Sequence, residues 1–260
     1  INDIRAVVED CRSHVAGGFT AGLDIWELAV VPYLLNNCDT WYSMSEKSLE
    51  VLDNLQNQFY RMMLKVPTGC PIPALYWECG GLLMKNRVLK KKLLLLHHIA
   101  TLEKSSFAYQ IFMTQKKLML PGLISECEEF LTRSGGPKPE SFSKYQWKNF
   151  VKEKILEINK SDLLDRMKSM TKLDSKVLSN ENFGLKSYFK TLNLADARLR
   201  FRIRSSMVPT VKMNFPNDPS FKGELWTCQH CSRIDTQSHI IMTVSYTHLR
   251  AHETSLHLVC

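Results

Sequence analysis

Apolar side chains recur at helical spacing along most of this 260-residue chain. The two clearest rows contain Leu52, Leu55, Phe59, Met62 and Met63, and then Trp147, Phe150, Val151, Ile155 and Ile158. Positions i, i+3, i+4 and i+7 lie on one face of an α-helix, so each row indicates a helix with one buried side. The sequence therefore predicts a mainly α fold.

Capping residues and prolines mark the helix boundaries. Ser43 and Glu46 form a capping-box pair before the first row, and Pro67 stops that helix. A further helix is predicted over residues 86–102, and a short one over residues 185–192. Residues 23–35 fit either a helix or a strand, because Pro32 and two β-branched valines weaken the helical pattern.

The net charge of +8 is concentrated in the middle of the chain. Residues 1–143 contain 15 Lys and Arg against 15 Asp and Glu, and residues 214–260 contain three against four. Residues 144–213 contain 16 basic against seven acidic side chains and therefore carry the whole excess. Such a local excess is typical of a surface that binds nucleic acid or anionic lipid, although a solvated helix face without a partner also carries charge.

An arginine ladder occupies residues 197–204, where apolar and cationic residues alternate. Its members are Arg198, Arg200, Arg202 and Arg204. On a strand these side chains would share one face, whereas on a helix they form two stripes, and the helical flanks favour the helix. Asp196 is the only acidic residue between positions 186 and 212, so the ladder has few local ion-pair partners. Together with Lys212 it is a candidate phosphate-binding set.

Cys228, Cys231 and His239 have the spacing of the first three ligands of a zinc knuckle. Thiolate and imidazole groups suit tetrahedral Zn²⁺, and a two-residue gap lets both sulfurs reach one ion. A fourth ligand is expected a few residues after His239, but residues 243–245 are Thr, Val and Ser. The ligand set is incomplete, and two free thiols in a surface loop are the alternative.

Composition excludes several classes of protein. An apolar content of 44% is too high for intrinsic disorder. The longest apolar run, residues 28–35, contains Pro32 and falls short of the roughly 20 residues that a membrane-spanning helix needs. The eight cysteines are scattered and do not form the framework of a secreted disulfide-rich domain. We therefore expect no membrane partner and an intracellular location, nuclear or cytoplasmic.

Several motifs occur in a fixed order along the chain. The first half contains LLNNCDTW at 34–41, LQNQFYRMMLKVP at 55–67 and ALYWECGGL at 74–82. These stretches resemble the post-palm and thumb region of the reverse transcriptases of non-LTR retrotransposons. The later motifs are DARLRFRIR at 196–204, KMNF at 212–215 and LWTCQHCSRIDTQSH at 225–239. They resemble the linker and the terminal CCHC knuckle of jockey-like elements.

The resemblance implies a division of the chain into six parts. These are the end of the palm and post-palm segment (1–42), a helical thumb-like domain (43–132), a linker (133–143), a basic helical domain (144–215), a truncated CCHC zinc knuckle (216–243) and a tail (244–260). The linker is also marked by its composition, RSGGPKPE at 133–140. The tail resembles a translated sequencing-adapter sequence, and we expect it to be artefactual.

The resemblance also implies a function. The chain is expected to be a C-terminal fragment of an RNA-directed DNA polymerase that grips template RNA and DNA primer. Tyr60, Arg61 and Lys65 would face the duplex backbone, the four ladder arginines and Lys212 would hold phosphates, and the three knuckle residues would bind Zn²⁺. The family's polymerase chemistry needs paired aspartates that hold Mg²⁺. No Asp-Asp pair occurs in this chain, so we expect the fragment to be inactive alone.

Two other hypotheses remain open. The first is a helical protein–protein interaction module with a structural zinc site, in which Trp147, Phe150 and Tyr188 form an exposed patch and binding does not depend on salt. The second places metal-hydrolase chemistry at His248 and His252, which stand four residues apart.

Overall fold

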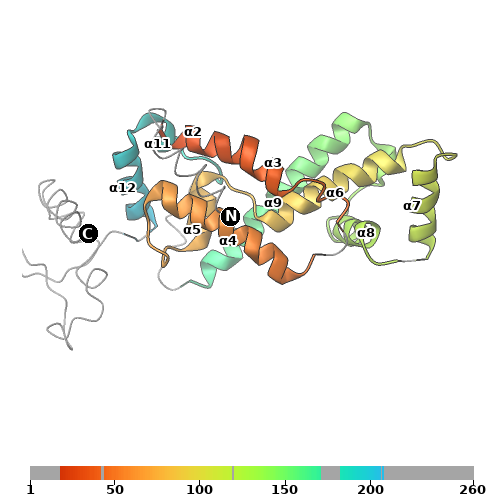
Figure 1. The fold of residues 1–260 in the computed structure, drawn as a ribbon, viewed down its shortest axis with the longest axis horizontal. Coiled ribbons are helices and arrows are strands. Elements are labelled where there is room, and N and C mark those ends of the chain that lie inside the picture. The colour runs from red at the N-terminus through yellow and green to blue at the C-terminus, as the bar shows by residue number, and fades with distance from the viewer. Residues whose placement is uncertain (1–17, 42–43, 119, 171–181, 206, 208–260) are drawn as a thin grey trace, which may run out of the picture. The chain divides into compact units, whose positions relative to one another are not determined.

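The computed structural model describes residues 18–41, 44–118, 120–170, 182–205 and 207, and Figure 1 shows their helices. Within these residues the chain is helical and contains no β-strand, which confirms the mainly α class. In chain order the elements are α2 (Gly18–Ile25), the π-helix η1 (Trp26–Val30), α3 (Val31–Leu34), α4 (Glu46–Leu64), α5 (Ile72–Cys79), α6 (Met84–Ala100), α7 (Phe107–Lys117), α8 (Leu123–Arg133), the 3-10 turn η2 (Pro139–Ser141), α9 (Lys144–Lys168), α11 (Tyr188–Thr191) and α12 (Leu194–Arg204).

The chain divides into two compact units, residues 1–198 and residues 199–260. The described residues of the first unit include every helix up to α11 and the first part of α12. The second unit is described only at residues 199–205 and 207. Each unit is therefore considered by itself.

Helix α4 starts at a different capping residue from the one predicted. The side chain of Ser45, not Ser43, caps the helix, because its Oγ accepts the backbone N–H of Ser48 at 3.2 Å. Ser43 itself lies outside the described residues. The helix ends at Leu64, two residues before the Val66-Pro67 pair that cannot continue it.

Residues 18–34 are helical, so the strand alternative for this stretch is excluded. The π-helix η1 joins α2 to α3 without a break, and Pro32 lies in the first turn of α3 directly after the π-helical turn. Trp26 in η1 is buried and stacks on Phe59 of α4 with a centroid distance of 4.4 Å. This contact attaches the N-terminal helices to α4.

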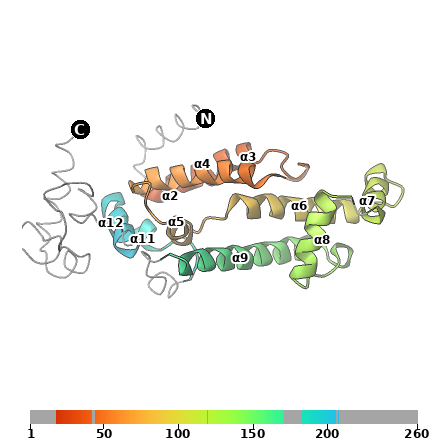
Figure 2. The ribbon, with the colours of Figure 1, turned by 90° about the horizontal axis from the view of Figure 1, so that it is seen from below.

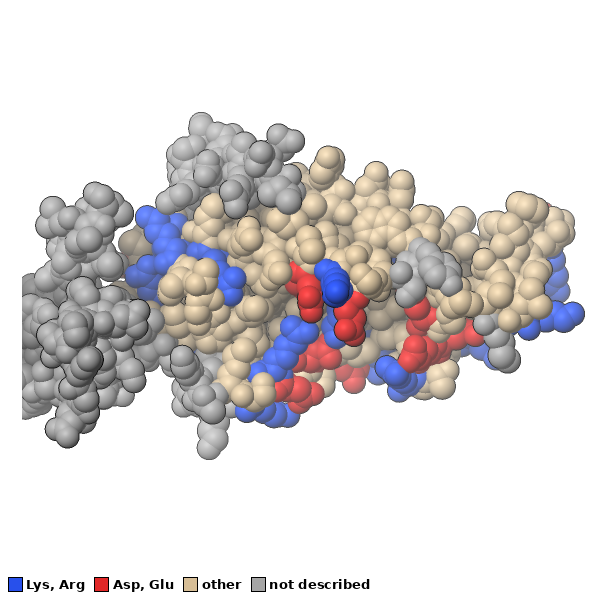
Figure 3. All heavy atoms as spheres, turned by 60° about the horizontal axis from the view of Figure 1, so that its bottom comes forward, with Lys and Arg blue, Asp and Glu red and all other residues tan. Residues whose placement is uncertain are grey.

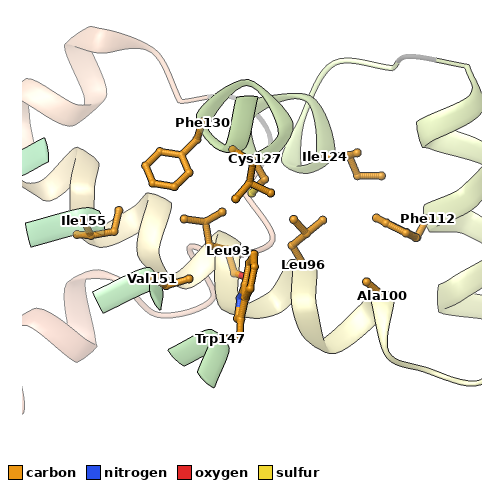
Figure 4. Packing of buried hydrophobic residues seen from close by; sticks show 11 residues of the cluster. Leu93, Leu96, Ala100, Phe112, Ile124, Cys127, Phe130, Trp147, Val151 and Ile155 are labelled. Carbon is orange, nitrogen blue, oxygen red and sulfur yellow. The ribbon is translucent and has the colours of Figure 1, made fainter. Parts of the chain in front are cut away.

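A hydrophobic core joins four helices on both sides of the predicted linker. Figure 4 shows Leu93 and Leu96 of α6, Phe112 of α7, Cys127 of α8 and Trp147 of α9 packed together. The indole N–H of Trp147 donates to the carbonyl oxygen of Leu93 at 2.9 Å, which ties α9 to α6. In Figure 2 these two helices run side by side.

The boundary predicted at residues 133–143 therefore does not separate two compact units. Glycines and prolines there form the connection between α8 and α9, and both helices contribute to one core. Asn159 of α9 strengthens the junction, because its side-chain oxygen accepts the backbone N–H of Leu83 at 2.9 Å and its amide donates to the carbonyl of Gly81 at 3.2 Å. Linker composition marked a loop but not a domain boundary.

The segment that follows residue 182 returns to the start of the first unit. The Tyr188 hydroxyl donates to the fully buried Glu78 carboxylate at 2.7 Å. Phe189 stacks on Phe19 of α2 with a centroid distance of 4.1 Å. The predicted helix over residues 185–192 is shorter than expected and covers only α11. These contacts place α11 beside helices from the first third of the sequence.

Candidate nucleic-acid interface

The C-terminal end of α4 is the first part of the candidate site. Lys65 adopts a left-handed conformation there, with φ 49° and ψ 49°. Its N–H donates to the Met62 carbonyl at 3.2 Å, and the N–H of Val66 donates to the Arg61 carbonyl at 3.0 Å. This pattern is a Schellman motif, in which glycine normally occupies the left-handed position. A lysine there costs roughly 1 kcal/mol of backbone strain, and such strain is enriched at functional positions.

A shallow hollow of about 340 Å³ lies beside this helix end. It is lined by Gln58, Arg61, Met62, Lys65, Val66 and Thr68. The Nε of Arg61 is buried and has no hydrogen-bond partner among the described residues. A buried guanidinium N–H without an acceptor is costly, so a movement of this side chain that brings the N–H to a ligand oxygen would be favoured.

Arg198 brings the beginning of the arginine ladder to the same place. Its Nε donates to the carbonyl oxygen of Met63 in the last turn of α4 at 2.9 Å. The two residues are 135 positions apart in sequence. A cation at a helix C-terminus is also stabilised by the helix dipole. Three of the cations singled out from the sequence, Arg61, Lys65 and Arg198, therefore come from one region of the first unit.

The ladder itself is helical, as its flanks indicated. Asn193 caps α12, because its side-chain oxygen accepts the backbone N–H of Asp196 at 2.9 Å while its amide donates to the Asp196 carboxylate at 2.8 Å. The remaining ladder arginines belong to the second unit. Arg200 is exposed, and Arg202 and Arg204 are half-buried.

Tyr60 does not belong to this surface. It is 1% exposed, and its hydroxyl accepts a hydrogen bond from the Gln56 amide at 2.9 Å. Burial raises the pKa of this phenol well above its usual range. The prediction that Tyr60 faces a nucleic-acid duplex is therefore wrong. The spacing of apolar residues predicted only one buried face for α4. It did not show that a second side of the helix, which carries Tyr60, is also covered.

Figure 3 shows how charge is distributed over one face of the molecule. Basic side chains lie at both ends, with the larger group on the left, whereas acidic and basic side chains are mixed along the middle. A larger hollow of about 790 Å³ between α6, α8 and α9 is lined by such mixed charges. Its lysines and arginine are paired: Lys92 with Glu126 at 2.6 Å, Lys85 with Asp162 at 2.6 Å, Arg133 with Glu129 at 2.6 Å and Lys154 with Glu157 at 2.8 Å. Paired cations give this hollow no net attraction for phosphate, so it is a poor alternative to the end of α4.

The predicted metal ligands Cys228, Cys231 and His239, and also Lys212, His248 and His252, lie outside the described residues. Among the residues that the structure does describe, no group of three or more His, Cys, Asp or Glu side chains is placed to hold a metal ion. The described thiols Cys38, Cys70, Cys79 and Cys127 are all buried. Burial raises the pKa of Cys127 to about 12, which keeps its thiol protonated and unsuited to metal binding.

The aromatic patch expected for an interaction module is not formed by the residues named for it. Trp147 is 1% and Tyr188 3% exposed, and Phe150 is half-buried against the core. These three side chains stabilise the fold and offer no exposed surface to a partner. The prediction of an exposed patch at Trp147, Phe150 and Tyr188 is therefore wrong.

No protein-family model matches this chain, and no curated protein or solved structure matches it. None of the described helices is both long enough and apolar enough to cross a membrane.

Proposed function

We propose that this chain binds the phosphate backbone of nucleic acid through the end of α4 and the arginine ladder, as the C-terminal part of a non-LTR retrotransposon reverse transcriptase. Its ligands are template RNA and DNA primer. The motif order along the sequence supports the family, and the position of the cations supports the binding. The chain carries no polymerase chemistry of its own in this proposal.

One observation supports the proposal above all others, namely the hydrogen bond from Arg198 to the Met63 carbonyl. It joins two segments that were each singled out from the sequence for phosphate binding. Arg61, with its buried and unpartnered Nε, and Lys65, with its strained backbone, lie within one turn of that carbonyl. Folding therefore gathers cations that are far apart in sequence.

The chemistry of these groups fits phosphate better than base recognition. Guanidinium groups donate in a fork that matches two phosphate oxygens, whereas lysine supplies a mobile point charge. Contacts of this kind position a protein on a nucleic acid without reading its sequence. We therefore expect similar affinities for RNA of different sequences. Zn²⁺ at Cys228, Cys231 and His239 belongs to the proposal as a structural ion, and Mg²⁺ belongs only to the parent polymerase.

The test is the salt dependence of binding, measured by fluorescence anisotropy with a labelled RNA and with an RNA–DNA duplex. Each phosphate contact contributes roughly 0.7–0.9 to the slope of log affinity against log salt concentration. The double substitution R61Q/K65Q should reduce the slope by roughly 1.4–1.8, because it removes two contacts. The triple substitution R200Q/R202Q/R204Q tests the rest of the ladder in the same way.

A matched control removes the same charge elsewhere. Lys148 and Lys152 are exposed on α9, and the structure shows no ion pair for either with a described residue. The K148Q/K152Q variant should leave the slope unchanged. An equal loss of slope in this control would show that binding follows overall charge and not the proposed site. Absence of binding at low salt by a folded chain would contradict the function altogether.

A further inference from the structure

Helix α7 has apolar side chains on two opposite sides, and only one of them is covered. Phe112 is 4% exposed and points into the core from α7 (Figure 4), with Tyr109 packed beside it. By contrast, Phe107 is 78%, Ile111 40% and Leu118 59% exposed. Of the eleven large hydrophobic side chains that are exposed in the described residues, five lie between positions 107 and 120. Three of these five lie within α7 itself, more than in any other described helix.

The exposed side chains of α7 form a narrow seam. Phe107, Ile111, Thr114 and Leu118 are spaced by four, three and four residues, which is the a/d spacing of a coiled coil. At about 100° per residue these positions fall within roughly 60° of the helix circumference, and Phe112 lies about 100° or more away. Met113, the other exposed apolar side chain of α7, lies about 100° from the seam on its other side, and Gln110 and Lys117 separate it from the seam. Thr114 is exposed, and its hydroxyl donates to the Gln110 carbonyl at 2.9 Å within the helix. The seam is therefore a continuous line along α7.

The width and charge of the seam identify what covers it. A helix that lies on a bilayer needs an apolar face about 100° wide or more, whereas a seam of two positions per heptad fits one partner helix. No acidic residue occurs between positions 104 and 125, with Glu103 directly before this stretch, and Lys104 and Lys117 are exposed at the two ends of α7. Lys116 is already paired with Glu128 at 2.8 Å. A second copy of this chain would bring like charges together across the seam. An acidic helix would complement them.

We propose that the outward seam of α7 binds one acidic amphipathic helix of a partner protein. Leucine-like side chains of that helix pack between Phe107, Ile111 and Leu118, and its carboxylates pair with Lys104 and Lys117. The seam is about 17 Å long at 1.5 Å per residue, which corresponds to three turns of a partner helix. This interaction is separate from nucleic-acid binding, because it uses none of the residues at the end of α4.

The test uses two synthetic peptides of three heptads, both with Leu at positions a and d. One carries Glu and the other Lys at positions e and g, so that like charges keep each peptide from pairing with itself. Binding to the full chain is followed by fluorescence anisotropy. We expect the Glu peptide to bind at least tenfold more tightly than the Lys peptide.

Three variants test whether the Glu peptide binds at the seam of α7. The seam variant F107S/I111S/L118S should weaken binding of the Glu peptide at least tenfold. Its control, L28S/Y33S/V51S, removes three other exposed apolar side chains and should change affinity less than twofold. The charge-reversed variant K104E/K117E keeps the seam and should prefer the Lys peptide. Circular dichroism would verify that each variant has the helical content of the parent chain.

Three results would overturn the proposal. The first is equal or absent binding of the two peptides to the parent chain. The second is a dimer in sedimentation velocity that the seam variant abolishes, because a second copy would then occupy the seam. The third is seam-dependent binding to vesicles of phosphatidylcholine and phosphatidylserine without peptide binding, which would assign the seam to a lipid surface. RNA affinity should be the same in the seam variant and the parent chain.

Discussion

Asn159 provides a quantitative test of how the two halves of the first unit are joined. This side chain is fully buried in α9, and its oxygen accepts both the Leu83 N–H at 2.9 Å and the Asn86 amide at 3.0 Å. Its own amide donates to the Gly81 carbonyl at 3.2 Å. The substitution N159A removes all three hydrogen bonds at once.

The expected loss in the free energy of unfolding follows from the polar groups that lose their hydrogen-bond partner in N159A. A hydrogen bond contributes roughly 1 kcal/mol net, and a buried polar group that loses its partner costs about 1–3 kcal/mol. The N–H of Leu83 and the carbonyl of Gly81 are stranded, whereas Asn86 lines the hollow between α6 and α9, where water can replace the lost bond. We therefore expect a loss of about 3–5 kcal/mol, a large part of the roughly 5–15 kcal/mol that stabilises a typical domain.

Urea denaturation of the full chain measures this loss. Hydrogen exchange at the Leu83 amide should accelerate in N159A, because that N–H loses its acceptor. The control E153A changes an exposed residue of the same helix and should alter stability by less than about 0.5 kcal/mol. If N159A cost less than about 1 kcal/mol and left Leu83 exchange unchanged, the junction between residues 81–86 and α9 would not be held as the structure indicates.

Two further predictions concern buried groups around α4. Burial raises the pKa of Asp53 above its usual 3.8, against the opposing hydrogen bond from the Met84 N–H, so the folded chain binds this proton more tightly than the unfolded chain. The free energy of unfolding therefore falls as pH rises from the Asp53 pKa of the unfolded chain to that of the folded chain. The variant D53N keeps an acceptor oxygen but cannot ionise. It should be more stable than the parent at neutral pH and should lose that advantage in acid. An advantage that grows in acid would refute this reasoning. A Cβ added at Gly81 would lie 2.2 Å from the Tyr60 hydroxyl oxygen, so G81A should cost roughly 1–3 kcal/mol and Y60F should restore part of it in the double variant. Purely additive losses in urea denaturation would show that the two groups do not touch. Y60F alone should leave RNA affinity unchanged, because Tyr60 is buried.

The success and failure of the sequence predictions around α4 have physical reasons. The periodicity of Phe59 and Met63 identified a helix, because it depends on neighbours within two turns. It missed Gln56 and Asn57, which are buried although polar. Gln56 is accommodated because its amide donates to Tyr60 and to the Leu82 carbonyl at 3.2 Å, a partner 26 residues away. No local pattern contains that partner.

The candidate site shows the same division. Arg61, Lys65 and the ladder arginines were found from their residue types and charge context. The proximity of Arg198 to the end of α4 was not found, since its hydrogen bond to the Met63 carbonyl depends on how α11 and the beginning of α12 return to the first helices. The exposed seam of α7 was also not predicted. A row of apolar residues indicates a buried helix face, but it does not tell whether that face is covered by the same chain or by a partner protein.

The sequence by itself indicated helices α4, α6, α9 and α12, because hydrogen bonds within a helix and its caps connect residues only a few positions apart. It also determined where positive charge is concentrated. Only the tertiary structure decided which helices share a core, that the glycine- and proline-rich segment joins α8 to α9 within one unit, and which cations lie together. Those outcomes depend on contacts between residues far apart in sequence, 135 positions for Arg198 and Met63, and no periodicity or composition specifies which distant surfaces fit one another.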